Sequence, residues 1–284
     1  MLERSPDMNA QATKGLMHGR RGLIMGVANS HSIAWGIAQT LAAHGAELCF
    51  TYQGDALGKR VAPLAKQAGS DFILPCDVED LASVDAVFAA MKDRWGTIDF
   101  IVHAIGFTDK RELKGRYADT TRENFSRTMV ISCFSFTEVA KRAAELMPNG
   151  GSMITLTYGG STRVMPNYNV MGVAKAALEA SMRYLANDFG PQGIRVNALS
   201  PGPVRTLAGA GVSDARAMYS FQRAHSPLRK SVSIEEIGGS ALYFLSDLSA
   251  GVTGEIHHID AGYNIISMPR PEDMKAPMSG EEDV

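Results

Sequence analysis

The chain has 284 residues, a formal net charge of −2, 45% hydrophobic residues and 20% charged residues. A chain of this length buries about three quarters of its unfolded surface, enough for one large α/β domain or two small ones. The charge gives no electrostatic reason to expect nucleic acid or a membrane as a partner, and no apolar run of 18 residues predicts a transmembrane helix. The three cysteines lack metal-type spacing, so we expect no metal. Their odd number, without a secretion signal, favours a reducing, cytoplasmic location.

Strand-like and helical patterns alternate along the chain. Strands are predicted at 22–25, 47–52, 72–75, 99–103, 152–157, 195–200 and 255–260, and helices at 33–44, 55–68, 80–94, 121–146, 168–189 and 233–246. This order predicts a single doubly wound Rossmann-type α/β domain, with a seven-stranded parallel sheet flanked by helices. The domain is expected over 19–268, between flexible tails at 1–18 and 269–284. Residues 201–227 show no clear periodicity and are predicted to form a substrate loop.

A glycine-rich turn follows the first predicted strand. Gly26 permits a tight turn and close approach of a pyrophosphate, while Gly36 would allow close packing of helix on strand. Ser32 stands in a longer loop than the usual three-glycine spacing allows, and the helix opens at Ile33 with amides suited to an anion. We expect Gly26, Ser32 and Ile33 to bind a dinucleotide; an ordinary strand–helix turn is the alternative.

The ends of the second and third strands predict an adenosine site. Gln53 can hydrogen-bond a ribose but carries no charge, which favours NADH over NADPH. Lys59 and Arg60 lie a helical turn further on, so a 2′-phosphate stays open as the alternative. Asp77, followed by Val78, is placed to accept from the adenine amino group, or else to cap the helix that starts near residue 80.

Two further strand ends supply candidate cofactor contacts. His103 ends the fourth strand and is either a general base or, as is more usual there, a packed side chain. After the sixth strand, a rigid turn offers the Val204 amide and the Thr206 hydroxyl as donors. The run after the fourth strand lets its backbone approach the cofactor at Ala104, Ile105 and Gly106.

The most informative pair is Tyr168 and Lys175, on the helix predicted from 168. Seven residues are close to two turns, so the side chains share one face, roughly 10 Å apart along the axis. A solvated polar face is the alternative interpretation. Pro166 and Asn167 would start and cap the helix near the end of the fifth strand, where Tyr158 would face the same cleft.

The chain resembles the enoyl-acyl-carrier-protein reductases of bacterial type II fatty-acid synthesis, a divergent branch of the short-chain dehydrogenase/reductase superfamily. The resemblance is colinear over about 19–268. The six-residue gap between Tyr168 and Lys175 sets this branch apart, because most of the superfamily has a three-residue gap. Ala104 departs from the serine of many members, which puts one polar contact in doubt. The matching stretches are 26–38, 47–53, 76–78, 103–107, Tyr158, 166–172, Lys175, 195–198, 202–207 and 247–251.

The resemblance implies hydride transfer from NADH to C3 of a trans-2-enoyl thioester on acyl carrier protein, during fatty-acid elongation. Tyr168 would hold the enolate oxygen, and Lys175 would fix the cofactor ribose and lower the pKa of the phenol. Tyr158 would be the second tyrosine of the catalytic site. A cytoplasmic homotetramer is also implied. The acyl channel would be lined by Phe107, Thr108, Tyr158, Met171 and the loop from Leu207.

Two other functions make different demands on these positions. An ordinary alcohol- or ketoacyl-type dehydrogenase of this fold needs a serine shortly before the tyrosine and a lysine four residues after it. Ser161 lies seven residues before Tyr168, and Gly172 occupies the lysine position, so both requirements fail. A non-catalytic dinucleotide sensor predicts damage to Tyr168, Lys175 or the glycine turn, and all three are intact.

Overall fold

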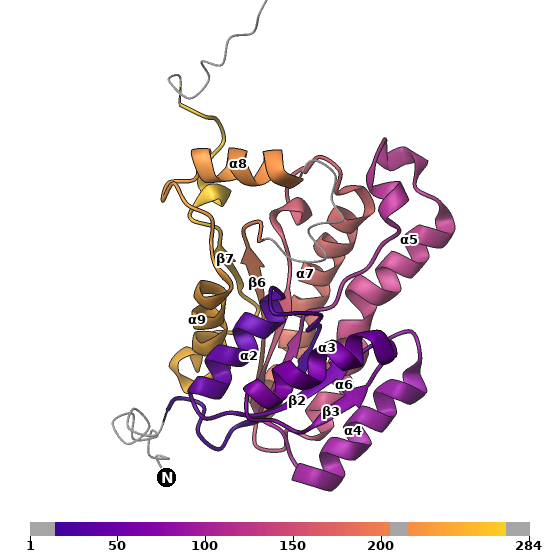
Figure 1. Cartoon of the computed structure of the whole chain (residues 1–284), viewed down its shortest axis with the longest axis vertical. Helices are drawn as coiled ribbons and strands as arrows, with labels where there is room; N and C mark the ends of the chain where they lie inside the picture. Colours follow the sequence, from indigo (N-terminus) through magenta and orange to yellow (C-terminus); the bar gives the residue numbers. More distant parts are fainter. Residues whose placement is uncertain (1–14, 205–214, 271–284) are drawn as a thin grey trace, which may run out of the picture.

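A parallel sheet of seven strands forms the centre of the computed structural model, which describes residues 15–204 and 215–270 (Figure 1). The strand order is β3-β2-β1-β4-β5-β6-β7, so the chain reverses its winding direction between β1 and β4. This confirms the predicted doubly wound fold. The strands are β1 (Arg21–Met25), β2 (Glu47–Tyr52), β3 (Ile73–Pro75), β4 (Phe100–His103), β5 (Gly151–Leu156), β6 (Ile194–Pro201) and β7 (Ile256–Ile259).

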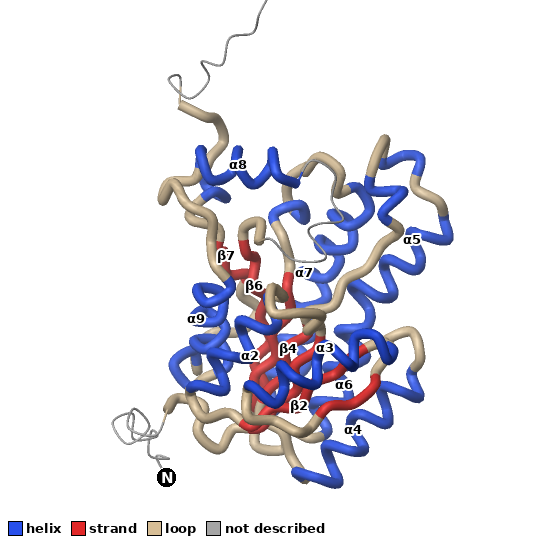
Figure 2. Tube along the Cα trace, in the orientation of Figure 1, coloured by secondary structure: helices blue, strands red, loops and turns tan. Residues whose placement is uncertain are grey.

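Helices cover both faces of the sheet (Figure 2). One apolar cluster joins one face of the sheet to α2 (Ile33–Ala43), α3 (Gly54–Gln67) and α9 (Ile234–Leu245). The other joins the opposite face to α4 (Leu81–Trp95), α6 (Ser135–Glu145) and α7 (Asn169–Phe189). The central strands are apolar on both faces because both are covered, and all four residues of β4 are buried.

The helix predicted at 121–146 contains a local widening. It consists of α5 (Arg122–Met129), a π-helical turn (Val130–Phe134) and α6. The Ser135 hydroxyl donates to the carbonyl oxygen of Ile131 at 2.7 Å, a side-chain bond that competes with the backbone ladder. Such turns have no clear apolar period, and the sequence pattern did not reveal this one.

We predicted a loop over 201–227, but part of this stretch is helical. Helix α8 (Ala215–His225) lies across the carboxyl end of the sheet, at the top of Figure 1. Its polar and charged composition, ARAMYSFQRAH, hides the helical period. The predicted contacts Thr206 and Leu207 lie outside the described residues.

The domain also begins earlier than predicted. The Met17 side chain is fully buried in the core around α2, and its backbone N–H donates to the carbonyl oxygen of His44 at 3.0 Å. The expected boundary at residue 19 therefore comes too late. The remainder of the predicted tails, 1–14 and 271–284, lies outside the described residues.

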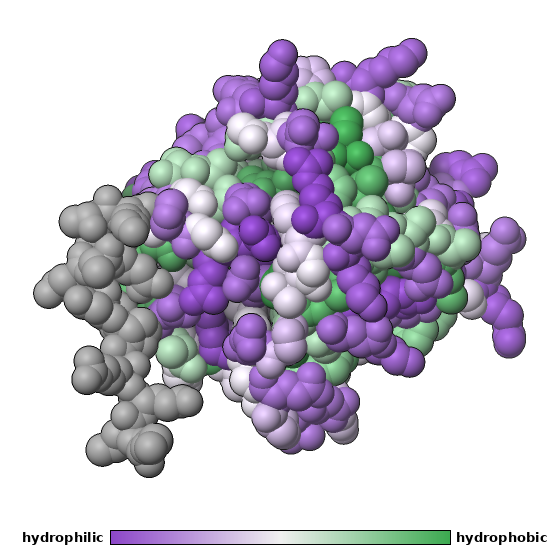
Figure 3. Space-filling view, turned by 90° about the horizontal axis from the view of Figure 1, so that it is seen from below, coloured by the Kyte–Doolittle hydropathy of each residue, from purple (hydrophilic) through white to green (hydrophobic). Residues whose placement is uncertain are grey.

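Charged side chains form ion pairs at the amino-terminal end of the sheet. Arg20, just before β1, pairs with Asp99 at 3.2 Å and Asp247 at 2.9 Å. The face seen from below in Figure 3 is mostly hydrophilic, with smaller apolar areas between the polar side chains. Of the helices described within 15–204 and 215–270, none is both long and apolar enough to cross a bilayer.

Candidate active site

The candidate site lies at the carboxyl ends of the strands, beside the switch between β1 and β4 (Figure 1). Segments far apart in sequence meet there, because parallel strands deliver the loops that follow them to one edge of the sheet. They are the glycine turn after β1, the ends of β2 and β3, the run 104–108 after β4, Tyr158 after β5 and the turn 202–204 after β6. Open α/β sheets bind their ligands at this edge.

One glycine and one buried hydroxyl shape the turn after β1. Gly26 has a φ of 100°, and a Cβ there would lie 2.1 Å from the carbonyl oxygen of Ala104, so a side chain does not fit. The Ser32 hydroxyl accepts from the backbone N–H groups of Ala28 at 3.0 Å and Asn29 at 3.1 Å. Ser32 thus holds the loop in shape. The first turn of α2 follows directly, with N–H groups that lack intrahelical acceptors and suit an anion.

Gly36 has a different role from the one we predicted. A Cβ on Gly36 would lie 2.5 Å from the carbonyl oxygen of Ile234, at the start of α9. A Cβ on Gly238 of α9 would lie 2.8 Å from the carbonyl oxygen of Gly36. Gly36 therefore allows helix to pack closely on helix, and not helix on strand, beneath the glycine turn.

The predicted adenosine site brings two strand ends together. Gln53 Nε2 donates to Asp77 Oδ2 at 2.9 Å, and the Gln53 side chain is exposed. The alternative role of Asp77 as a helix cap is wrong, because Asp80 caps α4 by accepting from the Ala82 N–H at 3.0 Å. Val78 is buried in the core, so only its backbone is placed to meet a ligand.

Ser132, which the sequence did not single out, fastens the run after β4. Its hydroxyl accepts from the Phe107 N–H and donates to the Phe107 carbonyl oxygen, both at 2.9 Å. Next to it, a Cβ on Gly106 would lie 3.6 Å from the Met171 methyl and 3.7 Å from Lys175 Nζ. Gly106 thus brings bare backbone against the lysine. A polar residue on the buried face of helix 121–146 was the signal that could have revealed Ser132.

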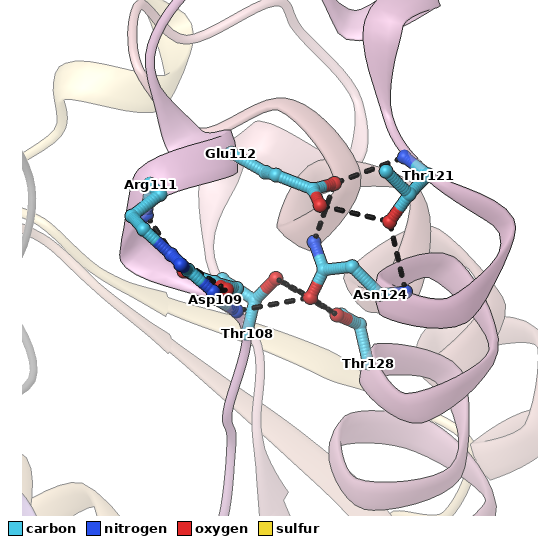
Figure 4. A network of polar contacts seen from close by, with 7 residues as sticks. All are labelled: Thr108, Asp109, Arg111, Glu112, Thr121, Asn124 and Thr128. Carbon is cyan, nitrogen blue, oxygen red and sulfur yellow. Dashed lines mark hydrogen bonds and ion pairs between the residues drawn. The ribbon is translucent and has the colours of Figure 1, made fainter.

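The Thr108 side chain belongs to a buried polar network (Figure 4). Asn124 Oδ1 accepts from the Thr108 hydroxyl at 3.2 Å and from the Asp109 N–H at 3.0 Å. Thr108 also accepts from Thr128 at 2.8 Å, and Asn124 Nδ2 donates to Glu112 at 3.1 Å. The network anchors the loop between β4 and α5. Since the Thr108 hydroxyl is taken up by it, the predicted substrate contact rests on the Thr108 backbone.

Tyr168 lies immediately before α7 and not inside it. The helix begins at Asn169, so the predicted cap at Asn167 is wrong. Both asparagines have positive φ, 56° at Asn167 and 37° at Asn169, a conformation that asparagine tolerates better than most residues. The chain therefore turns sharply on both sides of Tyr168. Its ring packs edge-on against Tyr158, with 5.1 Å between ring centroids.

Two glycines make room for this tyrosine. A Cβ on Gly160 would lie 2.5 Å from the Tyr168 ring, and a Cβ on Gly172 would lie 2.7 Å from the carbonyl oxygen of Gly160. A side chain at 172, where the ordinary dehydrogenases of this fold need lysine, would collide with the segment that carries Tyr158. The spacing of tyrosine and lysine is therefore tied to the local packing.

Lys175 is buried, so a solvated polar face is the wrong interpretation of this pair. Its side chain is 7% exposed, and Nζ donates to the carbonyl oxygen of Leu156 at 2.7 Å. Burial lowers the pKa of Lys175 to about 8. Burial also raises the pKa of Tyr168, and that of Tyr158 to about 12. We expected Lys175 to lower the pKa of Tyr168; in the structure, desolvation of the phenol dominates.

His103 is packed and does not serve as a base. Its ring is fully buried, Nε2 contacts Ser135 Oγ at 2.9 Å, and burial lowers its pKa to about 3. Because the Ser135 hydroxyl donates to Ile131, it accepts from the His103 ring. The usual interpretation of a histidine at a strand end is confirmed.

A cavity of about 560 Å³ adjoins the glycine turn, between the turn after β6, α8 and the start of α9. His31 and Val204 line it, and the Tyr219 hydroxyl donates to the Val204 carbonyl oxygen at 3.2 Å. Val204 therefore lines the cavity next to the glycine turn, and its carbonyl oxygen is occupied by Tyr219.

Comparison with known proteins identifies the family of the chain. The sequence model of a family described as enoyl-(acyl carrier protein) reductase matches residues 26–264. The chain is 76% identical over 261 residues to enoyl-[acyl-carrier-protein] reductase [NADH] 2 of Rhizobium meliloti, covering 92% of this chain and 97% of that protein.

Two solved structures are similar along nearly their whole length. FabI from Candidatus Liberibacter asiaticus is 60% identical with a TM-score of 0.89, over 90% of this chain and 99% of that one. The enoyl-(acyl-carrier-protein) reductase of Anaplasma phagocytophilum, in complex with NAD, is 53% identical with a TM-score of 0.88, over 90% and 98%. The chain therefore belongs to the enoyl-acyl-carrier-protein reductase family, as its sequence motifs predicted.

Proposed function

We propose that the chain reduces the carbon–carbon double bond of trans-2-enoyl thioesters on acyl carrier protein, with NADH, in fatty-acid elongation. The observation that carries this is the group formed by Tyr158, Tyr168 and Lys175 at the switch point of the sheet. Membership of the family supports it, as does the 76% identity to an NADH-dependent reductase.

The described residues fit a dinucleotide. A side chain at Gly26 would fill the space against Ala104, and α2 presents its first turn beside it. Gln53 is uncharged and hydrogen-bonds the acidic side chain of Asp77. This pair suits an adenosine whose ribose is not phosphorylated, because it offers no positive charge to a 2′-phosphate. Lys175 would bind the nicotinamide ribose. NADH, when bound, supplies the hydride.

Tyr168 would act as an oxyanion donor. Because burial raises its pKa, the phenol keeps its proton at neutral pH and can donate to the thioester oxygen as negative charge develops there. A donor of this kind is commonly worth about 3–4 kcal/mol in a site that excludes water. Tyr158, packed against Tyr168, would limit the position of the phenol and contact the substrate.

The acyl chain would lie against Phe107 and Met171. Phe107 is 42% exposed and next to Gly106, whereas Met171 is almost buried one turn before Lys175. Both side chains are apolar, and Ser132 contacts both residues: the backbone of Phe107 at 2.9 Å and the sulfur of Met171 at 3.7 Å. Val204 and Thr206 are proposed for the carboxamide or phosphates, and Leu207 for the acyl chain.

The family also suggests a homotetramer in the cytoplasm. Exposed apolar side chains support self-association: Phe125, Val130, Phe134 and Tyr184 are 37%, 41%, 53% and 75% exposed. They lie on the α5–α6 stretch and on α7, which pack against each other. Three free, buried cysteines suit a reducing compartment.

A thioester assay tests the activity. We expect the purified protein to oxidise NADH with crotonyl thioester and not with acetoacetyl thioester, followed at the nicotinamide absorbance band. NADPH should support a slower reaction because of Asp77. Oxidation driven by the acetoacetyl compound alone would assign the chain to a ketoacyl-type activity instead.

A further inference from the structure

A buried acid lies one helical turn beyond Lys175 and has no part in the chemistry proposed so far. Glu179 is 5% exposed, although glutamate is among the residues least often buried. A carboxylate is costly to bury unless it is hydrogen-bonded and matched by positive charge. The Glu179 carboxylate should therefore have a hydrogen-bond donor and a positive charge nearby.

Glu179 and Lys175 hold two consecutive residues at the end of β5. The Thr157 hydroxyl donates to Glu179 Oε1 at 2.5 Å. Lys175 Nζ donates to the carbonyl oxygen of Leu156 at 2.7 Å. Both side chains belong to one face of α7, at i and i+4. Tyr158 is the next residue along the chain. Its backbone therefore leaves the sheet from two residues that α7 holds in place.

Glu179 is also part of the electrostatic surroundings of Lys175. Two groups raise the pKa of Lys175 against burial: the Cys133 thiol on the π-helical turn and Glu179 on α7. The His103 ring on β4 is neutral, because burial and the ammonium lower its pKa. Cys133 contacts Ser181 and keeps its proton, because burial raises its pKa. Glu179 is thus the carboxylate that opposes the effect of burial on Lys175.

We propose that Glu179 is a positioning residue for the reduction, which holds the Tyr158 segment through Thr157 and keeps the Lys175 ammonium charged. The inference rests on the roles proposed for Lys175 and the two tyrosines. It assigns Glu179 two separable effects, one through a hydrogen bond and one through charge.

Three variants separate these effects. Glu179→Gln removes the charge and keeps an acceptor for Thr157, whereas Thr157→Val removes the hydroxyl and keeps the shape. Thr157→Ser restores the hydroxyl. The control is Asp188→Asn, which removes one negative charge from an exposed position on the same helix. The readouts are the Kd of NADH across pH values around 8, and kcat with crotonyl thioester.

For Glu179→Gln we expect the loss of NADH affinity with rising pH to begin roughly 0.5–1 pH unit lower than in the unmodified protein. Thr157→Val should lower kcat about tenfold, because Tyr158 loses its position. NADH affinity at neutral pH should stay within about twofold. Thr157→Ser should recover most of the loss, and Asp188→Asn should match the unmodified protein.

The inference fails if Glu179→Gln and Asp188→Asn have the same NADH pH profile, or if Thr157→Val keeps full turnover. Should Thr157→Val not fold, the profile of Glu179→Gln decides alone. Failure of the unmodified protein to reduce crotonyl thioester would refute the proposed function instead. Normal reduction with unaffected variants would refute only the role of Glu179.

Discussion

Burial shifts the pKa values of the two central residues in opposite directions, because it favours the neutral form of each. It keeps Tyr168 neutral by raising the pKa of the phenol, and it brings the pKa of Lys175 down to about 8, near the working pH. The phenol is therefore a hydrogen-bond donor at any physiological pH. The lysine is the group of this pair whose charge changes near neutrality, so the pH dependence of the site is expected to reflect Lys175.

NADH binding should weaken as the pH rises through about 8. The sign follows from the ammonium: below its pKa Lys175 is charged and attracts the anionic cofactor, and above it the charge is lost. A fluorescence titration of NADH at several pH values measures this. Lys175→Met should bind NADH more weakly at neutral pH and lose the dependence. If that variant kept the slope of the unmodified protein, another group would be responsible.

The Tyr168 hydroxyl should affect kcat more than it affects the binding of NADH. Tyr168→Phe keeps the ring that packs on Tyr158 and removes only the hydroxyl. We expect kcat with crotonyl thioester to fall about 10²–10³-fold, with the Kd of NADH nearly unchanged. Tyr117→Phe, at a tyrosine that is 48% exposed and precedes α5, is the matched control and should have no effect. Equal turnover in both variants would remove Tyr168 from the chemistry.

At the scale of elements, the π-helical turn between α5 and α6 carries a side chain that shapes the candidate site. It presents Ser132 to the backbone of Phe107, so the run after β4 is held by a side chain from another element. The widened turn thus contributes directly to the shape of the site.

Ser132→Ala should loosen this run. The Phe107 N–H loses its acceptor, which predicts a loss of about 1–3 kcal/mol in the free energy of unfolding. The KM for the thioester should rise more than the Kd of NADH, since Phe107 is proposed to line the acyl channel. Denaturant unfolding and steady-state kinetics measure the two effects. Ser126→Ala, exposed on α5, is the control; a Ser132 variant as stable as this one would argue against the bond.

The sequence predicted the elements that repeat a pattern and missed those that break one. Strands between helices were found because both faces of the sheet are apolar, and Tyr168 and Lys175 because their spacing is specific to one branch of a superfamily. The π-helical turn has no period of its own, and polar residues hide α8. Gly36 was found but given the wrong partner, since a glycine does not reveal what will lie against it.

At the scale of the whole molecule, the two ends of the sheet have different roles. The amino-terminal end carries the ion pairs of Arg20, and the carboxyl end carries the residues proposed for the reaction. α7 connects this site to the surface: Lys175 and Glu179 face inward, while Tyr184 projects outward and is 75% exposed. A contact made by a second copy through the outer face of α7 would therefore support the helix that carries Lys175.

Such a contact predicts that self-association and activity are linked. Phe134→Glu together with Tyr184→Lys places charge on the exposed apolar face of the α5–α6 stretch and α7, and should convert the proposed tetramer to smaller species, because charge is depleted at the centres of interfaces. Light scattering coupled to size exclusion gives the mass. Asp93→Lys, exposed on α4, controls for a change of charge.

We expect the smaller species to turn over crotonyl thioester more slowly and to unfold at lower temperature, because α7 loses the support on its outer face. A double variant with the mass of the unmodified protein would place the interface elsewhere. A dissociated variant with full activity would show that α7 needs no support from a second copy.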